Sequence, residues 1–299
     1  MVMKNRVEVS VGITVYNEEK NIPNIVSSLI SQKTSLVNIL EIIVVSSGST
    51  DRTNELVKEF SDKDKKVKLL IQKTREGKAS AINLFLKKMK GEIAVIESGD
   101  TIPREDTVEE LCKPFLTNPK LGLTGARSIP TNDKNTFLGS IIHYWWWMHN
   151  ELPRFGEMIA FRKELVPEVF EKTAVDEAYI EAMITDKGYE KLQIPSAVVN
   201  NHGAESLKDL IKQRKRVYIG HKLLIAEKNY HVQSFNVSRL LKLTARYLRK
   251  EKSVKTAVYI FGGILIEFYS RLLGMYGLKF KKENPYIWSF SLSTKTVNK

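Results

Sequence analysis

The stretch VEVSVGITVYNEEKNIPNIVSSLI at residues 7–30 decides the fold class. Apolar residues alternate from Val7 to Val15, which is typical of a β-strand, and the polar residues Tyr16 to Glu19 follow. Apolar residues then recur at helical spacing from Ile22 to Ile30, with Pro23 in the first turn, where its missing N–H costs little. The stretch therefore predicts a strand, a polar loop and an amphipathic helix.

The same alternation continues along the first third of the chain. Strand patterns at residues 39–45, 67–71 and 93–96 are separated by helix patterns with apolar stripes at residues 56–60 and 81–89. Short apolar strands separated by amphipathic helices predict a parallel sheet with right-handed crossovers, and such sheets bind ligands beyond the carboxyl ends of their strands. We therefore expect the polar loops after the first, second and fourth strands to meet at one edge.

The composition of the 299-residue chain narrows the class of protein. With 42% apolar and 27% charged residues, the chain is expected to be globular rather than collagen-like or disordered. A single cysteine, Cys112, excludes an internal disulfide framework and fits a reducing compartment. No G-x-G-x-x-G motif follows the first strand, and Gly77-Lys78 lacks the rest of a P-loop, which argues against dehydrogenases and P-loop NTPases.

The formal net charge is +13, and most of it lies between Ser206 and Lys255, where 14 lysines and arginines stand against three acids. Such a stretch attracts phosphate groups, or it is simply a solvated helical face. Residues 256–278 are mostly apolar but contain Glu267 and Arg271. Three interpretations stay open for this segment: a membrane span, a helix lying on an anionic membrane surface, and a soluble helical appendage.

Six short motifs occur in the order found in family-2 glycosyltransferases of the GT-A fold, and the chain resembles that family over residues 7–218. The motifs are Val11 to Glu19, Gly48 to Asp51, Gly77 to Ala79, Ser98 to Thr101, Asp176-Glu177 and Gln213 to Arg216. The resemblance implies an α/β fold of the GT-A type, Rossmann-like, with a mostly parallel sheet flanked by helices. We expect residues 1–126 to bind the nucleotide-sugar, residues 127–218 to bind the acceptor and carry catalysis, and residues 219–299 to form a basic and apolar helical extension.

The resemblance implies an inverting glycosyltransferase that moves a sugar from a nucleotide-diphosphate donor to a hydroxyl of a glycan or lipid-linked acceptor, with Mg²⁺ or Mn²⁺. This reaction must neutralise a departing diphosphate and remove a proton from the attacking hydroxyl. Asp100 stands where the family has the last acid of its Asp-x-Asp metal motif, and Ser98 replaces the first acid. His202 is a candidate additional metal ligand or a structural histidine, and Glu97 is expected to point to the other face of the sheet.

Asp176 and Glu177 begin a predicted helix and are the candidates for the catalytic base. The resemblance aligns Glu177 with the usual base and Asp176 with the acid before it, although the family normally has Glu and then Asp. Either residue can serve as the base, or both simply stabilise the helix N-terminus.

The resemblance also implies a set of donor-binding residues. Ser46 and Ser47 occupy positions that the family usually fills with acids, so their hydroxyls would bond a base or ribose without charge. Gln213 and Arg216 match a Gln-x-x-Arg-Trp element in which Val217 replaces the aromatic residue, and Arg216 would bind the diphosphate unless the run is only a charged surface. The full expected set is Thr14, Tyr16, Asn17, Glu18, Ser46, Ser47, Asp51, Lys78, Gln213 and Arg216.

Two rival functions follow from departures in the sequence. A catalytically inactive scaffold that binds a nucleotide-sugar or a lipid would explain Ser98 and the Ser46-Ser47 pair. A nucleic-acid binder would explain the basic stretch, but no base-reading module is present, so we expect no nucleic-acid partner. The expected location is the cytoplasm, with peripheral binding at the inner face of the membrane.

Overall fold

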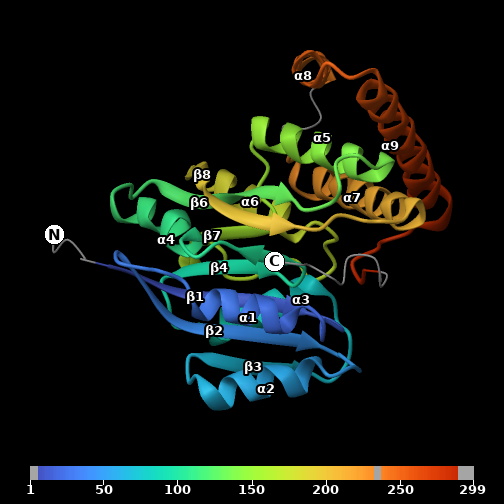
Figure 1. Cartoon of the computed structure of the whole chain (residues 1–299). Coiled ribbons are helices and arrows are strands. Elements are labelled where there is room, and N and C mark those ends of the chain that lie inside the picture. Colours follow the sequence, from blue (N-terminus) through green and yellow to red (C-terminus); the bar gives the residue numbers. More distant parts are fainter. Residues whose placement is uncertain (1–5, 232–236, 289–299) are drawn as a thin grey trace.

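The computed structural model describes residues 6–231 and 237–288, so parts of the expected C-terminal extension, at 232–236 and 289–299, lie outside the described residues. The described residues form one eight-stranded sheet in the order β3-β2-β1-β4-β7-β6-β8-β5. Helices cover both faces of this sheet, and further helices gather at one end of the molecule (Figure 1). The predicted α/β class is therefore confirmed.

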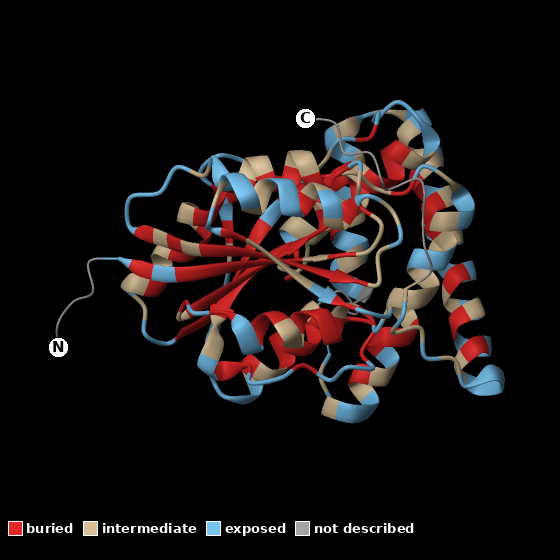
Figure 2. Ribbon diagram, turned by 90° about the horizontal axis from the view of Figure 1, so that it is seen from below, coloured by how far each residue is buried: buried red, intermediate tan, exposed pale blue. Residues whose placement is uncertain are grey.

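The first third of the chain folds as the alternation predicts. Its elements are β1 (Val7–Val15), α1 (Ile22–Ile30), β2 (Val37–Ser47), α2 (Thr53–Lys63), β3 (Val67–Gln72), α3 (Lys78–Lys88) and β4 (Ile93–Ser98). Strands β1 to β4 pair in parallel. Because helices cover both faces, β1, β2 and β4 are almost entirely buried (Figure 2), whereas the edge strand β3 is only half-buried and exposes Ile71.

The second part of the chain makes the sheet mixed. Its elements are β5 (Thr101–Pro103), α4 (Thr107–Cys112), a 3₁₀ helix (Lys113–Leu116), β6 (Leu121–Pro130), α5 (Phe137–Glu151), β7 (Met158–Arg162), a 3₁₀ helix (Lys163–Leu165), α6 (Asp176–Asp186) and β8 (Glu190–Asn201). Strand β7 runs antiparallel to both β4 and β6, while β8 runs parallel to β6. Strand β5 was not predicted, because three residues are too few for a periodic pattern.

Three helices complete the described chain: α7 (Leu207–Lys228), α8 (Val237–Glu251) and α9 (Val254–Lys281). Small residues on α9 allow close packing against its neighbours: an added Cβ at Gly263 would lie 3.0 Å from Ile141 of α5, and one at Gly274 would lie 2.6 Å from Tyr218 of α7. The opposite face of α9 exposes large apolar side chains, among them Phe261 and Phe268. By length and composition alone, α9 is long and apolar enough to cross a membrane.

Candidate functional site

A pocket of about 190 Å³ lies at the carboxyl ends of β1, β2 and β4, which is where the polar loops were predicted to meet. We call it the sheet-edge pocket. Of the twelve expected positions, ten for the donor and two for the metal, eight line it: Thr14, Tyr16, Glu18, Ser47, Lys78, Asp100, Gln213 and Arg216. The Thr14 hydroxyl is buried and has no hydrogen-bond partner among the described residues, so it offers a polar contact to a ligand.

A second pocket of about 130 Å³ adjoins the first, and we call it the inner pocket. Lys78, Asp100 and Arg216 line both pockets. Glu177 lines the inner pocket, so the structure brings Asp100 and Glu177, which are far apart in the sequence, to one cavity. The assignment of Asp100 as a metal ligand and Glu177 as a base requires the two residues to lie at one site in this way.

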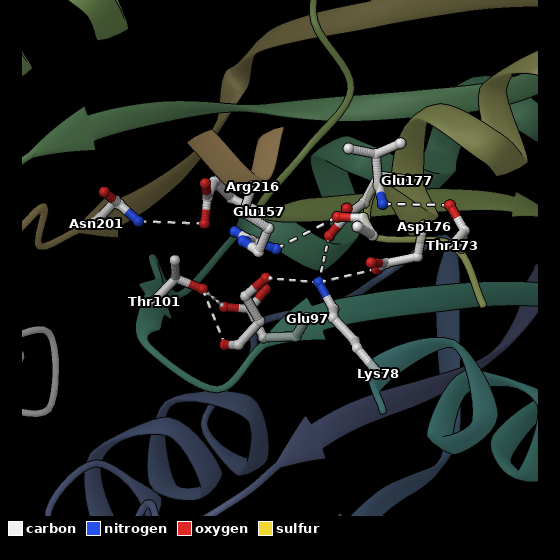
Figure 3. A network of polar contacts seen from close by, with 12 residues as sticks. Lys78, Glu97, Thr101, Glu157, Thr173, Asp176, Glu177, Asn201 and Arg216 are labelled. Carbon is white, nitrogen blue, oxygen red and sulfur yellow. Dashed lines mark hydrogen bonds and ion pairs between the residues drawn. The ribbon is translucent and has the colours of Figure 1, made fainter. Parts of the chain in front are cut away.

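Lys78 is the first residue of α3 and lies between the two candidate bases (Figure 3). Its Nζ atom is 3.1 Å from Oδ2 of Asp176, donates a hydrogen bond to Oε1 of Glu177, and lies 3.4 Å from Oγ of Ser98. Burial alone would lower the pKa of Lys78, but the charges of Asp176 and Glu177 raise it above its ordinary value. Lys78 is therefore an ammonium ion that bridges the two carboxylates.

The pKa values of the two carboxylates are shifted in opposite directions. Asp176 is fully buried, and burial together with the charge of Glu177 raises its pKa to about 6. Burial would also raise the pKa of Glu177, but the ammonium group of Lys78 more than offsets this effect and holds that pKa below its ordinary value. Both groups are therefore mostly ionised at neutral pH, but only Glu177 lines the inner pocket, so Glu177 is the carboxylate placed to accept a proton from a ligand.

Asp100 fits the role of a ligand to a hard cation. It lies in the turn between β4 and β5, and no hydrogen bond or ion pair engages its carboxylate within residues 6–231 and 237–288. The same part of the chain contains no cluster of three or more His, Cys, Asp or Glu side chains able to hold a metal ion. Oxygen ligands from a substrate diphosphate would therefore have to complete the coordination of Mg²⁺ or Mn²⁺.

Glu157 is a further acid at the inner pocket, and the sequence analysis missed it. It precedes β7 in a left-handed backbone conformation with φ 58°, which is uncommon for a residue other than glycine. Its Oε2 atom accepts a hydrogen bond of 3.2 Å from the Asn201 side chain. Burial and then the charges of Asp100 and Glu177 raise the pKa of Glu157 to about 8, so this group is mostly protonated at neutral pH.

His202 and Glu97 lie at the edge of this arrangement. His202 lines the inner pocket, and both of its ring nitrogens are engaged: Nδ1 lies 2.9 Å from Oγ1 of Thr131 and Nε2 lies 2.8 Å from Oε1 of Glu205. A role for His202 as a metal ligand would require one of these contacts to be exchanged. Glu97 is fully buried, accepts a hydrogen bond from Thr101 and lines neither pocket.

Three of the expected donor-binding residues support the loops behind the sheet-edge pocket and do not line it. Asn17 accepts a hydrogen bond of 2.8 Å from the backbone N–H of Thr50. Ser46 is fully buried and donates a hydrogen bond of 2.9 Å to Oγ of Ser49. Asp51 accepts hydrogen bonds from backbone N–H groups at the start of α2 and in the loop after β1. Direct donor contacts by these three residues stay a prediction.

A segment after α9 forms one wall of the sheet-edge pocket, and the sequence analysis did not anticipate it. The guanidinium group of Arg216 lies 3.4 Å from the centre of the Trp288 ring, and that of Arg75 lies 3.8 Å from the centre of the Tyr16 ring. Arg75 also donates a hydrogen bond to the backbone carbonyl of Trp288. Burial lowers the pKa of Arg216 to about 10, so the group remains cationic at neutral pH.

Comparison with solved structures identifies the fold as GT-A. The mannosyltransferase PcManGT from Pyrobaculum calidifontis, solved in complex with GDP-Man and Mn²⁺, has a TM-score of 0.64 and 21% identity, with coverage of 93% of this chain and 88% of that one. Glucosyl-3-phosphoglycerate synthase from Mycobacterium tuberculosis, solved with Mn²⁺, UDP and phosphoglyceric acid, has a TM-score of 0.51 and 22% identity, with coverage of 73% and 78%.

Sequence comparison agrees with the structural one. The probable glycosyltransferase YdaM from Bacillus subtilis is 25% identical over 79% of this chain and 60% of its own length. Poly-beta-1,6-N-acetyl-D-glucosamine synthase from Staphylococcus epidermidis is 31% identical over 44% of this chain and 31% of its own length. The chain thus spans less than two thirds of these curated relatives. The model of the family described as glycosyl transferase family 2 matches residues 10–170, more than half of the chain, and the protein therefore belongs to that family of glycosyltransferases.

Proposed function

We propose that this glycosyltransferase transfers a sugar from a nucleotide-diphosphate donor to an acceptor hydroxyl with inversion at the anomeric carbon. The observation that carries the proposal is the shared cavity of Asp100 and Glu177, with the cations of Lys78 and Arg216 beside them. Cations suit a departing diphosphate, and an ionised carboxylate suits proton removal, so both requirements of the reaction are met at one site. In the proposal residues 1–126 bind the donor and residues 127–218 bind the acceptor.

The proposed reaction proceeds by displacement. The acceptor oxygen forms a bond to the anomeric carbon on the side opposite the diphosphate, while the bond from that carbon to the diphosphate oxygen breaks and the nucleoside diphosphate leaves. Glu177 takes the proton from the acceptor hydroxyl, because it lines the inner pocket whereas Asp176 is fully buried and lines neither pocket. Arg216 lines the sheet-edge pocket and would bind the diphosphate.

Asp100 would hold the divalent cation of the proposed reaction. When bound there, Mg²⁺ or Mn²⁺ supplies positive charge to the diphosphate oxygens and so stabilises the leaving group. The open carboxylate of Asp100 and its place in the sheet-edge pocket support this role. The solved mannosyltransferase and phosphoglycerate synthase both contain Mn²⁺, which is consistent with it.

Turnover by purified protein tests the proposal. We expect consumption of UDP- or GDP-sugars with Mn²⁺, and its loss in Asp100→Ala, while Asp62→Ala on the exposed side of α2 serves as a matched control. Calorimetry should show that Asp100→Ala also loses the Mn²⁺-dependent part of nucleotide binding. Unchanged turnover in Asp100→Ala would remove the metal assignment. Binding of donor without any consumption by the wild-type protein would instead favour the inactive scaffold suggested by Ser98.

We further propose that the protein binds peripherally to the inner face of a membrane through α8 and α9. The exposed face of α9 is apolar, and α8 exposes cations that include Arg239, Lys242 and Lys250. Sedimentation with phosphatidylglycerol vesicles should be lost in Phe261→Asp/Phe268→Asp. Substitution of an exposed leucine on β8, Leu192→Asp, should not affect it, and equal loss in both variants would contradict the assignment of the surface.

A further inference from the structure

A third cavity, of about 250 Å³, lies between α5, α7, α8 and α9, and we call it the chamber. Most of its lining is apolar, with Met148 and Leu152 from the end of α5, Val217 from α7, Leu240 from α8 and Ile264 from α9. An apolar cavity of roughly 150 Å³ is enough to hold a benzene molecule. The chamber is therefore large enough for a piece of a hydrocarbon chain.

The chamber adjoins the inner pocket. Trp145, His149, Arg154 and Arg214 line both cavities. The inner pocket also contains Glu177, the proposed base. A molecule in the chamber therefore lies next to the cavity in which we place the acceptor hydroxyl.

At its other end the chamber opens between α8 and α9. Leu241 and Ile264 line the chamber and are also 66% and 45% exposed, respectively. The opening lies beside the exposed apolar face of α9, which includes Phe261, Leu265 and Phe268. An apolar passage from an apolar surface to the site of transfer suits a ligand with a hydrocarbon chain, whereas a water-soluble sugar gains nothing from it.

At the junction where the chamber adjoins the inner pocket lies an arginine that makes no direct ion pair within residues 6–231 and 237–288. Arg154 lies in the loop between α5 and β7, and its guanidinium group is 3.3 Å from Nε2 of His149. Burial and the charges of Arg154 and Arg214 hold the pKa of His149 well below its ordinary range, so this partner is uncharged. Within the described residues Arg154 forms no ion pair, although the charges of Glu157, Glu177 and Glu181 act on it without direct contact. A buried cation without a contacting anion is costly.

The other cations of the junction are already paired. Arg214 donates two hydrogen bonds to Glu267, at 2.6 and 3.1 Å, and Arg271 donates one of 2.8 Å to the same carboxylate. One carboxylate thus serves two guanidinium groups, and this cluster keeps a net positive charge. Together with Arg154, it makes the junction suitable for an anionic group next to an apolar chain.

We infer that the chamber binds the hydrocarbon chain of a phosphate-bearing lipid acceptor, whose phosphate group contacts Arg154 while its reacting hydroxyl lies at Glu177. The inference rests on the proposed glycosyl transfer and names the class of acceptor. The chamber holds only part of a long chain, and the remainder leaves between Leu241 and Ile264 toward the membrane. Both parts of this ligand are needed. Inorganic phosphate would not fill the apolar chamber, and a lipid without a phosphate group would not provide an anion to Arg154.

Binding of farnesyl phosphate to the full chain tests the inference. The tryptophan fluorescence of the chain, to which Trp145 in the chamber lining contributes, should report binding, with farnesol and inorganic phosphate as the two partial ligands. We expect farnesyl phosphate to bind at least tenfold more tightly than farnesol, and inorganic phosphate at equal concentration not to displace it. Equal affinity for farnesyl phosphate and farnesol, or displacement by inorganic phosphate, would overturn the inference.

Two variants locate the binding site. Arg154→Gln should weaken farnesyl phosphate about tenfold and leave farnesol unchanged, with the exposed Arg127→Gln as its control. Leu241→Glu at the opening should weaken both ligands, and Leu36→Glu, at a leucine of 45% exposure before β2, should weaken neither. Leu241 is exposed, so its substitution tests the site even if Arg154→Gln fails to fold. Wild-type affinity in both variants would exclude the chamber as the binding site.

Different measurements test the lipid acceptor and the proposed transfer reaction. Hydrolysis of the donor by water with Mn²⁺ needs no lipid and reports the transferase site alone. Farnesyl phosphate binding without any donor turnover would contradict the proposed function, whereas donor turnover without farnesyl phosphate binding would contradict only the assignment of the acceptor.

Discussion

Replacement of Lys78 by methionine should destabilise the protein in a way that depends on pH. Lys78 is the ammonium group between Asp176 and Glu177, and the exposed fractions of the three side chains are 11%, 0% and 16%. Methionine fills similar space but leaves two buried carboxylates without their cation. Removing one partner of such a buried pair costs about 3–5 kcal/mol of unfolding free energy. For a chain of this size the midpoint of thermal unfolding should fall by roughly 5–8 °C.

The direction in which the stability of the variant changes with pH follows from the pKa values of Asp176 and Glu177 in the folded and unfolded chain. Without Lys78, burial raises the pKa of both acids in the folded chain above their unfolded values, so the folded state keeps protons that the unfolded state releases. The variant should therefore lose stability as pH rises above about 4. In the wild-type protein the pKa of Glu177 is lowered, so its contribution is lost only as pH falls through acid values. The deficit of the variant should thus be large at pH 8 and small near pH 4.5.

Thermal melts followed by circular dichroism at pH 4.5 and pH 8 measure this difference. Lys88→Met, at an exposed position on the same helix, is the matched control and should melt like the wild-type protein at both pH values. Lys78→Met/Asp176→Asn should recover part of the loss at pH 8, because one of the two unpaired charges is gone. An equal deficit at both pH values, or no recovery in the double variant, would refute the electrostatic explanation.

Three further predictions concern other parts of the molecule. In the folded chain the pKa of Glu157 is raised from 4.5 to about 8, so the wild-type protein should lose unfolding free energy as pH rises between those values. Glu157→Gln should remove this loss, which is at most about 5 kcal/mol. The exposed Glu164→Gln should not change it, and thermal melts across this pH range would show the difference. Gly12→Ala should cost about 1–3 kcal/mol in urea denaturation, because its Cβ would lie 2.7 Å from the Phe85 ring, while Gly156→Ala, with nothing within 4 Å, should cost much less. Removal of divalent cations by EDTA should abolish donor turnover, and added Mn²⁺ should restore it; full activity after EDTA would contradict a metal-dependent reaction.

Strong local patterns made the first half of the fold predictable. The alternation of apolar residues from Val7 to Val15 and the apolar stripe of α1 are defined by spacings of a few residues. Such short-range patterns can be recognised in the sequence without knowledge of the fold. The convergence of the loops after β1, β2 and β4 followed from the general geometry of parallel sheets. These two inferences were enough to bring Asp100 to the right edge of the sheet.

The remaining site residues depend on packing between distant segments. Trp288 follows Arg216 by more than seventy residues, and no periodic pattern links it to the sheet-edge pocket. Glu157 and Arg154 lie in an irregular loop, where the sequence carries no signal for which way a side chain points. The charges of Lys78 and Glu177 were visible in the sequence, but their pairing across 99 positions was not.

The two hydrogen bonds from Arg214 to Glu267 limit how freely the C-terminal part could be exchanged between related proteins. Arg214 stands next to Gln213 and two positions before Arg216, both of which line the sheet-edge pocket. A chimera that carried a different last helix without an acid at position 267 would release this arginine beside these two pocket residues. The last helix and the sheet-edge pocket are therefore not independent modules, and an engineered replacement must preserve that single carboxylate.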